Sequence, residues 1–567
     1  MKKPTRCFVP HGLVIEKWED IAPYFDEIDR RVIEGKDDLK RWLKESSELE
    51  AVMEEELAWR YINMTIDTTS KENQERYQYF VAEISPKAQP FYNRFNQKLF
   101  NSEYKTKLDD EFGYDVLLRS VEKELALFRE ENIAIQSELD QLSQEYGNIA
   151  GSMQIELDGK ELTMQQAAKL LAENDINLRQ NVYEKINNRR FQDREALHKL
   201  LDQLIAKRQL VAKNADFENY RDYKFEAMGR FDYTPQDCFD FHDAVKKAVL
   251  PVMETIHAER KKQLQLDVLK PYDLEVDPTG LAPLNPFKDG KELIDKSIEA
   301  FTQINPTFGE YLTIMRDNGF LDLESKKGKA PGGYNYPLYE SGVPFIFMNA
   351  VGTHDDLITM MHEGGHAIHS FLTADLKLTA FKSLPSEVAE LASMSMELIS
   401  MDVWDLFYTN EQDLKRAKKD QMERMLMVLP WVAIVDKFQH WLYENPSHTH
   451  QEREDQWMAM QADFGSSIVD WTGYENFKAI AWQKQLHIYE VPFYYIEYGF
   501  AQLGAIAVWK NYKENPAKAL EKYQEALSLG YTKTIPAIYE AAGIQFNFSA
   551  AYVNELVDFV KAEMEAL

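Results

Sequence analysis

The chain has 567 residues, and its 94 Asp and Glu side chains outnumber its 65 Lys and Arg side chains, which gives a formal charge of −29 at pH 7. So acidic a body repels phosphate backbones and anionic bilayers, so we expect neither nucleic acid nor membranes among its partners. With 44% hydrophobic and 12% aromatic residues, the sequence is too apolar to be disordered. Its length allows three or four domains, or one large helical body.

The cysteine content and the N-terminus indicate a cytoplasmic protein. Two cysteines, Cys7 and Cys238, provide no disulfide framework and no thiolate metal site, as is usual in a reducing compartment. The first twenty residues, MKKPTRCFVPHGLVIEKWED, lack the apolar run of a signal peptide. The longest apolar stretch, residues 425–435, is interrupted by Pro430 and is shorter than the roughly 20 residues that span a bilayer.

The N-terminal part of the chain has the pattern of long amphipathic helices. From residue 26 to about residue 216 the sequence is charged and poor in Pro and Gly, with apolar residues at three- and four-residue spacing, as in DDLKRWLKESSELEAVMEEELAWRYINMTI. The same period continues through residues 111–142 and 164–210, which predicts a helical array. A coiled coil is the alternative, but the apolar positions drift too far for strict heptads.

Residues 263–350 have a different composition. Eight prolines fall between Pro271 and Pro344, and long helices do not persist through such a density of proline. The pieces YDLEV and VPFIFMNA in this stretch favour short strands, so we predict a small β-sheet here. After Thr353 the helical pattern returns and continues to the C-terminus.

The motif HEGGH at residues 362–366 has the HExxH pattern of a zinc site. On a helix, residues i and i+4 share a face, so His362 and His366 can reach one Zn²⁺ while Glu363 points into the same cleft. The surrounding sequence predicts that helix: Thr353 can cap it with Asp356 as its capping-box partner, and a buried stripe follows, formed by Leu357, Met360, Met361, Ile368, Phe371 and Leu372.

The two glycines inside this motif argue against a chance match. Gly364 and Gly365 each cost about 1 kcal/mol relative to Ala in a helix interior. We therefore expect another backbone or a substrate to approach closely at these positions.

A catalytic zinc site needs a third protein ligand, and the segment PSEVAELASMSME at residues 385–397 offers three. Glu390 and Glu397 lie seven residues apart on one helix face, so the first can bind the metal while the second holds a ligand imidazole. Glu387 can compete for the ligand role. His354 and His369 are further candidates.

These segments resemble the thimet oligopeptidase and oligoendopeptidase F family of zinc metallopeptidases, on its oligoendopeptidase F side. The resemblance is carried by GTHDDLITMMHEGGHAIHSF, ELASMSMEL, IAKRQLVAKNADFENYRDYKFEAMGRFDYTP, LKPYDLEVDP and KAPGGYNYPLYESGVPFIFMN. It implies one Zn²⁺ per chain, with Glu390 as third ligand and Glu397 outside the ligand shell. It also implies a mainly α fold: a zincin-like catalytic region, residues 181–567, with a small β-sheet inside a large helical body split by a deep channel, and residues 1–180 as one channel wall.

The segment HIYEVPFYYIEY at residues 487–498 is ambiguous by composition, because four tyrosines and a histidine also suit an aromatic core helix. The family resemblance instead implies that His487, Tyr495 and Tyr498 are catalytic donors to the substrate carbonyl, and that Tyr494 contacts substrate. The glycine-bearing segment gives Gly332, Gly333, Tyr334 and Phe345 as further substrate-binding candidates. Residues 342–350 can offer a strand edge for an extended peptide.

The sequence thus predicts a zinc-dependent endopeptidase that hydrolyses internal bonds of short unstructured oligopeptides, with Glu363 as the base that activates the water. Two alternatives stay open: a related helical HExxH carboxypeptidase, and a noncatalytic helical scaffold. The expected partners are oligopeptide substrates, and the sequence allows either a monomer or a dimer.

Overall fold

The computed structural model describes residues 6–108, 113–330 and 332–567. The chain divides into two compact units, each assembled from three separate segments. Unit 1 comprises Met1–Ala126, Leu284–Lys418 and Gly504–Phe546, and unit 2 comprises Leu127–Pro283, Lys419–Leu503 and Asn547–Leu567. Residue 180, the predicted boundary, falls inside unit 2; the division into a wall at 1–180 and a catalytic region at 181–567 stays a prediction.

Unit 1 is helical around one small sheet. Its first segment contains α1 (Trp18–Arg30), α2 (Lys36–Ile66), α3 (Lys71–Tyr79), η1 (Phe80–Ile84), α4 (Ser85–Asn101), η2 (Lys105–Lys107) and α5 (Tyr114–Leu127). The second contains α13 (Gly290–Ile304), α14 (Pro306–Asp317), β3 (Leu321–Glu324), β4 (Tyr334–Tyr336), β5 (Phe345–Ala350), α15 (His354–Thr373), α16 (Thr379–Lys382), α17 (Ser386–Ile399) and η6 (Ser400–Leu406). The third contains α23 (Pro516–Ser528) and α24 (Ile535–Ala541).

Unit 2 consists of helices and one hairpin. They are α6 (Glu131–Gly151), β1 (Gln154–Leu157), β2 (Lys160–Thr163), α7 (Met164–Lys169), η4 (Leu170–Ala172), α8 (Ile176–Gln192), α9 (Arg194–Asn214), α10 (Tyr220–Ala227), α11 (Pro235–Ala248), α12 (Leu250–Gln263), η5 (Pro271–Asp273), α19 (His450–Phe464), α20 (Glu475–Ala479), η7 (Ala481–Lys484), α21 (Leu486–Glu490) and α25 (Ala550–Ala566). Two helices, α18 (Glu411–Glu444) and α22 (Ile496–Glu514), continue from one unit into the other.

The predicted mainly α fold with a small sheet is confirmed. The amphipathic pattern of the N-terminal region gives helices whose apolar faces meet in one core, where Phe25, Trp42 and Phe95 pack together with their rings 5.8 to 6.1 Å apart. Burial of such aromatic side chains stabilises this segment. The deep channel stays a prediction.

The sheet of unit 1 has the strand order β3-β5-β4, with β3 parallel and β4 antiparallel to β5. The expectation that residues 342–350 provide a free strand edge is therefore wrong, because β5 is the central strand and both its edges are paired. The edge strands are β3 and β4. The prediction of a strand at YDLEV is also wrong. Tyr272 and Asp273 belong to the 3-10 turn η5, and the remaining residues, 274–276, form a bend.

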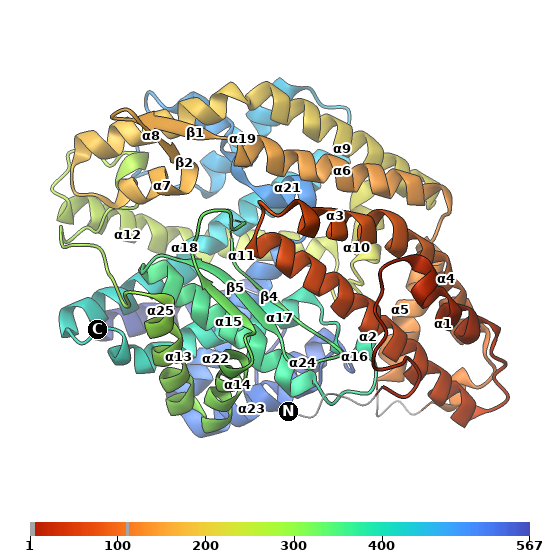
Figure 1. The fold of residues 1–567 in the computed structure, drawn as a ribbon. Helices are drawn as coiled ribbons and strands as arrows, with labels where there is room; N and C mark the ends of the chain where they lie inside the picture. Colours follow the sequence, from red (N-terminus) through yellow and green to blue (C-terminus); the bar gives the residue numbers. More distant parts are fainter. Residues whose placement is uncertain (1–5, 109–112, 331) are drawn as a thin grey trace. The chain divides into compact units, whose positions relative to one another are not determined.

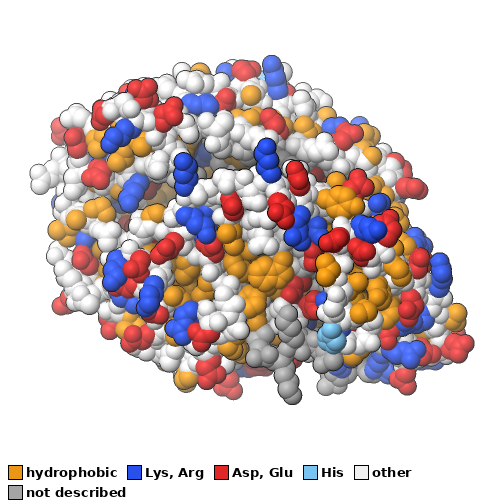
Figure 2. Space-filling view, in the orientation of Figure 1, with side chains coloured by type: hydrophobic (Ala, Val, Ile, Leu, Met, Phe, Trp, Pro, Cys, Tyr) orange, Lys and Arg blue, Asp and Glu red, His pale blue; other side chains and the backbone are white. Residues whose placement is uncertain are grey.

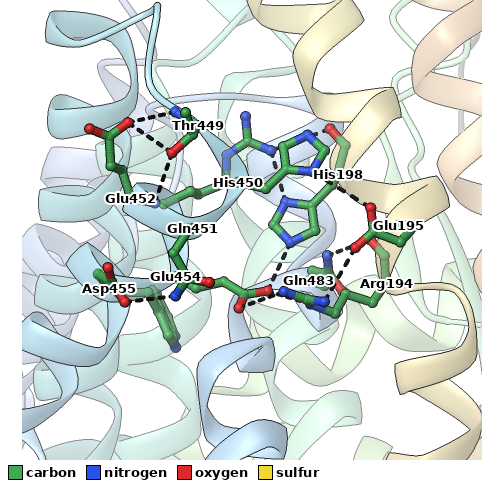
Figure 3. Close-up of polar contacts among 12 residues, drawn as sticks. Arg194, Glu195, His198, Thr449, His450, Gln451, Glu452, Glu454, Asp455 and Gln483 are labelled. Atoms are coloured by element: carbon green, nitrogen blue, oxygen red, sulfur yellow. Dashed lines mark hydrogen bonds and ion pairs between the residues drawn. The ribbon is translucent and has the colours of Figure 1, made fainter.

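A partly buried ionic network ties α9 to α19 within unit 2 (Figure 3). Glu454 accepts hydrogen bonds from Arg194 Nε and Nη2 at 2.5 and 2.8 Å, and its Oε1 lies 2.9 Å from His198 Nε2. The same helices are joined again by His450 Nε2 and Asp202 Oδ2, 2.7 Å apart. These contacts hold α9 against the first turns of α19, the helix that precedes α20 and η7 in the chain.

Acidic and basic side chains are interspersed over the face drawn in Figure 2. On this face the carboxylates are therefore mixed with cations and do not form one continuous negative patch. Within the residues that the structure describes, no helix has the length and hydropathy needed to cross a bilayer.

Candidate metal centre

Helix α15 carries the HExxH motif, and its start is fixed by the expected capping box. Thr353 Oγ1 accepts from Asp356 N at 3.3 Å, and Asp356 Oδ2 accepts from Thr353 N at 2.8 Å. One face of the helix is buried through Leu357, Met360 and Met361, next to β5 and α17 (Figure 1). The regular helix places His362 and His366 one turn apart, with ring centroids 4.8 Å from each other.

The two glycines of the motif lie where α15 meets its neighbours. A Cβ on Gly365 would lie 2.6 Å from Ser393 Cα and 2.7 Å from Ala392 O of α17, and a Cβ on Gly364 would lie 2.4 Å from the ring of Phe301 on α13. The close approach that the sequence predicted is therefore made by α17 and α13. Gly365 sets the separation of the two helices that carry the candidate ligands.

Glu390 of α17 meets both imidazoles of α15. Its Oε2 lies 3.4 Å from His362 Nε2 and 3.7 Å from His366 Nε2, and one ligand atom from each residue falls within 4.8 Å of the others. Bonds of about 2.0 to 2.1 Å in a tetrahedron place neighbouring ligand atoms about 3.4 Å apart. The three side chains thus have the spacing and the donor types of a His2Glu zinc site, and at 22, 20 and 7% exposed they remain reachable from solvent.

Two further contacts orient these ligands. His362 Nδ1 lies 2.7 Å from Glu397 Oε1, which leaves Nε2 to face Glu390. Ser393 Oγ donates to Glu390 Oε2 at 3.0 Å. Burial alone lowers the pKa of His362, but the Glu397 hydrogen bond and the charges of Glu390, Glu397 and Glu363 raise it to about 10. The carboxylates therefore stabilise positive charge at this position, which favours a bound cation.

Glu363 is buried, at 6% exposed. Burial raises its pKa to about 7, aided by Glu390 and Glu397 and opposed by His362. Its Oε2 has no hydrogen-bond partner among the described residues. A carboxyl with a pKa near neutrality and an uncommitted oxygen is suited to take up and release a proton.

The other candidate ligands lie outside this group. Glu387 is buried on α17, and its backbone carbonyl accepts from the Tyr539 hydroxyl at 3.1 Å. His354 Nδ1 is hydrogen-bonded to the Tyr408 hydroxyl at 2.7 Å. His369 is 1% exposed, and burial lowers its pKa to about 3, so its ring is neutral. The geometry thus favours Glu390 over these three alternatives.

The predicted donors His487, Tyr494, Tyr495 and Tyr498 all lie in unit 2 and form one half-buried ring cluster. The His487 ring centroid is 4.8 Å from that of Tyr495 and 5.7 Å from that of Tyr498, and Tyr494 lies 5.3 Å from Tyr498. Burial lowers the pKa of His487 to about 4 and raises that of Tyr495 to about 12. At neutral pH the imidazole is uncharged and the phenol keeps its proton, so both can donate hydrogen bonds.

The predicted substrate-binding residues of unit 1 lie on or next to the sheet. Gly332 has a φ of +98°, which suits glycine, and Gly333 leads into the edge strand β4. The Tyr334 hydroxyl is 2.6 Å from Thr65 Oγ1, and its ring stacks on Phe347. Phe345 is 3% exposed, so its side chain belongs to the core, and its backbone lies in the central strand opposite Tyr336 of β4.

Sequence reasoning missed three polar side chains that support these residues. Ser393 follows Glu390 by three residues on α17, and this spacing could have indicated it. Asn335 Nδ2 donates to the backbone carbonyl of Glu363 at 3.3 Å, and Gln485 Nε2 lies 2.7 Å from His487 Nδ1. The Asn335 contact depends on how the sheet packs on α15, for which the sequence holds no local pattern.

The structure also brings Cys238, Asp436 and His440 together, fully buried in unit 2 and with possible ligand atoms within 4.8 Å. Asp436 Oδ2 is already 2.9 Å from His242 Nε2 and 3.2 Å from His440 Nε2. The hydrogen bond with His242 and the nearby His440 ring account for this buried carboxylate. The sequence did not predict this cluster.

Fold and site together define a mainly helical protein in which the HExxH motif lies on α15 and a glutamate from α17 faces it. Residues 170–558 match the profile of peptidase family M3, and residues 13–128 match the peptidase M3 N-terminal domain. The chain belongs to peptidase family M3, and the predicted resemblance to the oligoendopeptidase F family is confirmed.

Relatives and solved structures agree with this family. An oligoendopeptidase F homolog of Borreliella burgdorferi is 26% identical over 332 residues, which is 56% of this chain and 54% of the relative. Oligopeptidase PepF of Bacillus subtilis is 25% identical over 244 residues, 42% of this chain and 35% of the relative. In these two comparisons the matched region therefore spans about half of the relative's own length or less.

Two solved structures match over nearly the whole chain. The structure of PZ peptidase A with an inhibitor has a TM-score of 0.90 and 26% identity and covers 97% of both chains. That of oligoendopeptidase F from Enterococcus faecium has a TM-score of 0.67, covers 97% of both chains, and at 16% identity supports the fold alone.

Proposed function

We propose that the chain is a zinc-dependent endopeptidase that hydrolyses internal bonds of short unstructured oligopeptides. The observation that carries the proposal is the convergence of His362, His366 and Glu390 at metal-ligand spacing beside the buried carboxyl of Glu363. The names of the relatives, oligoendopeptidase F and oligopeptidase PepF, support a peptide substrate of limited size.

The donor set favours Zn²⁺ as the metal, because two imidazoles and one carboxylate are a common zinc ligand set that leaves a coordination position open. His362, His366 and Glu390 would hold it, and Glu397 and Ser393 would keep His362 and Glu390 in place. When bound, Zn²⁺ would polarise the scissile carbonyl and make water a stronger acid.

Glu363 would move the proton during hydrolysis. Its raised pKa, about 7, lets the carboxylate accept the proton of the attacking water near neutral pH and then pass it to the nitrogen of the leaving amine. The hydroxyl of the water joins the carbonyl carbon as the C–N bond breaks, so the products are one carboxylate and one amine. The Glu363→Gln variant should keep the metal and lose nearly all turnover, because the ligands survive and the base does not.

Two parts of the proposal concern the substrate. Edge strand β4 is the position at which an extended peptide could pair by main-chain hydrogen bonds, and this mode would give broad sequence preference. His487, Tyr495 and Tyr498 as donors to the substrate carbonyl, with Tyr494 in contact with substrate, follow from the family resemblance and stay predictions. A cytoplasmic location and the choice between monomer and dimer also stay predictions.

The test is digestion of a mixed peptide library beside a folded protein, with and without chelator, and with the Glu363→Gln variant as a metal-bound control. Mass spectrometry of the products should show cleavage at internal bonds of short peptides, lost with chelator and restored by Zn²⁺. Release of C-terminal residues alone would support the carboxypeptidase alternative. A protein that retains no zinc and cleaves nothing would be the noncatalytic scaffold.

A further inference from the structure

Unit 2 contains a cavity of about 540 Å³ that the proposed chemistry does not use. Its walls come from α6, α8, α12, α18, α19, α20 and η7, together with the residues between them. Six aromatic side chains line it: Tyr146, Tyr183, Trp431, Phe464, Trp471 and Phe477. Both the volume and the apolar walls are typical of a site for a small organic ligand.

The charge of the cavity is opposite to that of the chain. Its charged lining residues are three cations, Arg190, Lys478 and Lys484, and one carboxylate, Glu275, in a protein whose net charge is −29. Cations held in an apolar, partly desolvated enclosure attract an anion more strongly than they would at an open surface. The cavity therefore selects for a ligand with negative charge.

Two of these cations are available to a ligand. Within the described residues, the side chains of Lys484 and Arg190 form no hydrogen bond or ion pair, although Lys484 Nζ lies 4.8 Å from the centroid of the Trp431 ring. Burial lowers the pKa of Lys484 to about 8, the charge of Arg190 lowers it further, and Glu275 opposes both. Lys484 is nevertheless solvent-accessible, as expected for a side chain whose free surface faces a cavity.

A buried acceptor adds a second requirement on the ligand. Gln483 lines the cavity, is 4% exposed, and leaves its Oε1 without a hydrogen-bond partner among the described residues. Its orientation is fixed, because Nε2 donates to the backbone carbonyl of Arg194 at 3.0 Å, beside the network in Figure 3. A buried carbonyl oxygen in this state favours a ligand that carries an N–H group.

We propose that this cavity binds the C-terminal residue of a peptide. The terminal carboxylate pairs with Lys484 and Arg190, the residue's amide N–H donates to Gln483 Oε1, and its apolar side chain packs among the aromatic walls. This site lies in unit 2, whereas the candidate metal ligands lie in unit 1, and binding here does not depend on the proposed hydrolysis.

The cavity wall is also connected to one of the predicted catalytic residues. Trp431 Nε1 donates to Gln485 Oε1 at 3.0 Å, and Gln485 Nε2 lies 2.7 Å from His487 Nδ1. A ligand seated against Trp431 is thus two hydrogen bonds from the His487 imidazole. Trp431 and Trp471 also supply fluorescent reporters in the wall itself.

The test is isothermal titration of the full chain at pH 7 with N-acetyl-L-phenylalanine and with its amide, which lacks the carboxylate. Neither probe contains a bond between two amino acids, so the result is independent of peptidase activity. The acid should bind at least about 10-fold more tightly than the amide, and Lys484→Met and Arg190→Gln should each weaken the acid by about 10-fold or more. The matched control is Lys262→Met, an exposed lysine of α12 outside the cavity lining, which should leave affinity unchanged.

Two further arms make the result specific. The titration is repeated after a chelator has removed metal, and unchanged affinity is expected, because a carboxylate bound at the His362 site would be lost. Affinity of the wild type should also fall as pH rises from 7 to 9 while that of Lys484→Met stays flat. The comparison with Lys484→Met is needed because other titratable side chains also line the cavity: Arg190, Glu275, Lys478, His257, Tyr146 and Tyr183.

Several outcomes would overturn the proposal. Equal binding of acid and amide would show that the cavity does not recognise the carboxylate. Unchanged affinity in both cavity variants, or loss of binding on chelation, would show that the carboxylate binds outside this cavity. No binding of either probe at millimolar concentration would show that the cavity binds neither probe. Peptidase activity without this binding would refute the cavity proposal alone, and binding without activity would refute the proposed function alone.

Discussion

Replacing Gly365 with alanine should weaken metal binding without touching a ligand. The new Cβ would lie 2.6 Å from Ser393 Cα, and an ordinary contact begins at 3.4 Å, so α15 and α17 must separate by about 0.8 Å. His366 is on one helix and Glu390 on the other, and metal-ligand distances tolerate only about 0.2 Å. We therefore expect zinc affinity to fall at least about 10-fold.

The net loss of stability should be about 0 to 2 kcal/mol. Overpacking costs about 1 to 3 kcal/mol, whereas alanine gains about 1 kcal/mol over glycine inside a helix. The measurements are zinc affinity by competition with a fluorescent chelator and the midpoint of thermal unfolding without metal. Gly147→Ala on α6 is the matched control, because a Cβ there meets no atom within 4 Å. A Gly365→Ala protein that binds zinc as tightly as the wild type would refute the reasoning.

Three further predictions follow from the contacts described above. Glu390→Ala should abolish stable zinc binding, measured as metal content after dialysis, while Glu387→Ala should retain it; the reverse pattern would move the ligand to Glu387. Tyr498→Phe should lower kcat by about 10²-fold with little change in KM, as for a donor that acts in the transition state, and a change in KM alone would count against that role. Glu454→Gln should lower the free energy of unfolding by about 2 kcal/mol near pH 7. Burial raises the pKa of Glu454, but His198 and Arg194 lower it to about 2 from 4.5, so its contribution is present above pH 4.5 and is lost as pH falls toward 2. Urea unfolding at pH 7 and at pH 3 should show the difference between wild type and variant shrinking at pH 3, and a constant difference would contradict the assignment.

The two histidines of the candidate metal site could be predicted from the sequence because helical geometry ties them to local spacing. His362 and His366 share a face by their four-residue separation, and the capping box at Thr353 fixes where the helix begins. Helical spacing alone did not decide whether Glu387 or Glu390 is the third candidate ligand. The family resemblance favours Glu390, and the packing of α17 on α15 at Gly365 places it beside both histidines.

The errors concern strands, for which pairing partners matter more than local composition. The composition of VPFIFMNA predicts a strand, and this segment forms β5, but the central place of β5 between β3 and β4 depends on residues far away in the chain. YDLEV has β-forming residues and still adopts a turn. The hairpin β1–β2 was missed although Asp158 and Gly159, both with positive φ, form the Asp-Gly turn that usually indicates one.

The division of unit 1 into three segments has a consequence for how the chain folds during synthesis. Its first segment ends at Ala126 and its last begins at Gly504, and contacts such as Ser47 with Thr379 and Phe381 with Tyr531 join the segments. At about 5 to 20 residues per second, the ribosome completes the third segment roughly 20 to 80 s after the first. During the first part of that interval the core formed by α1 to α5 lacks Leu378 and Phe381, which the second segment supplies, so this stretch of the nascent chain benefits from protection against aggregation.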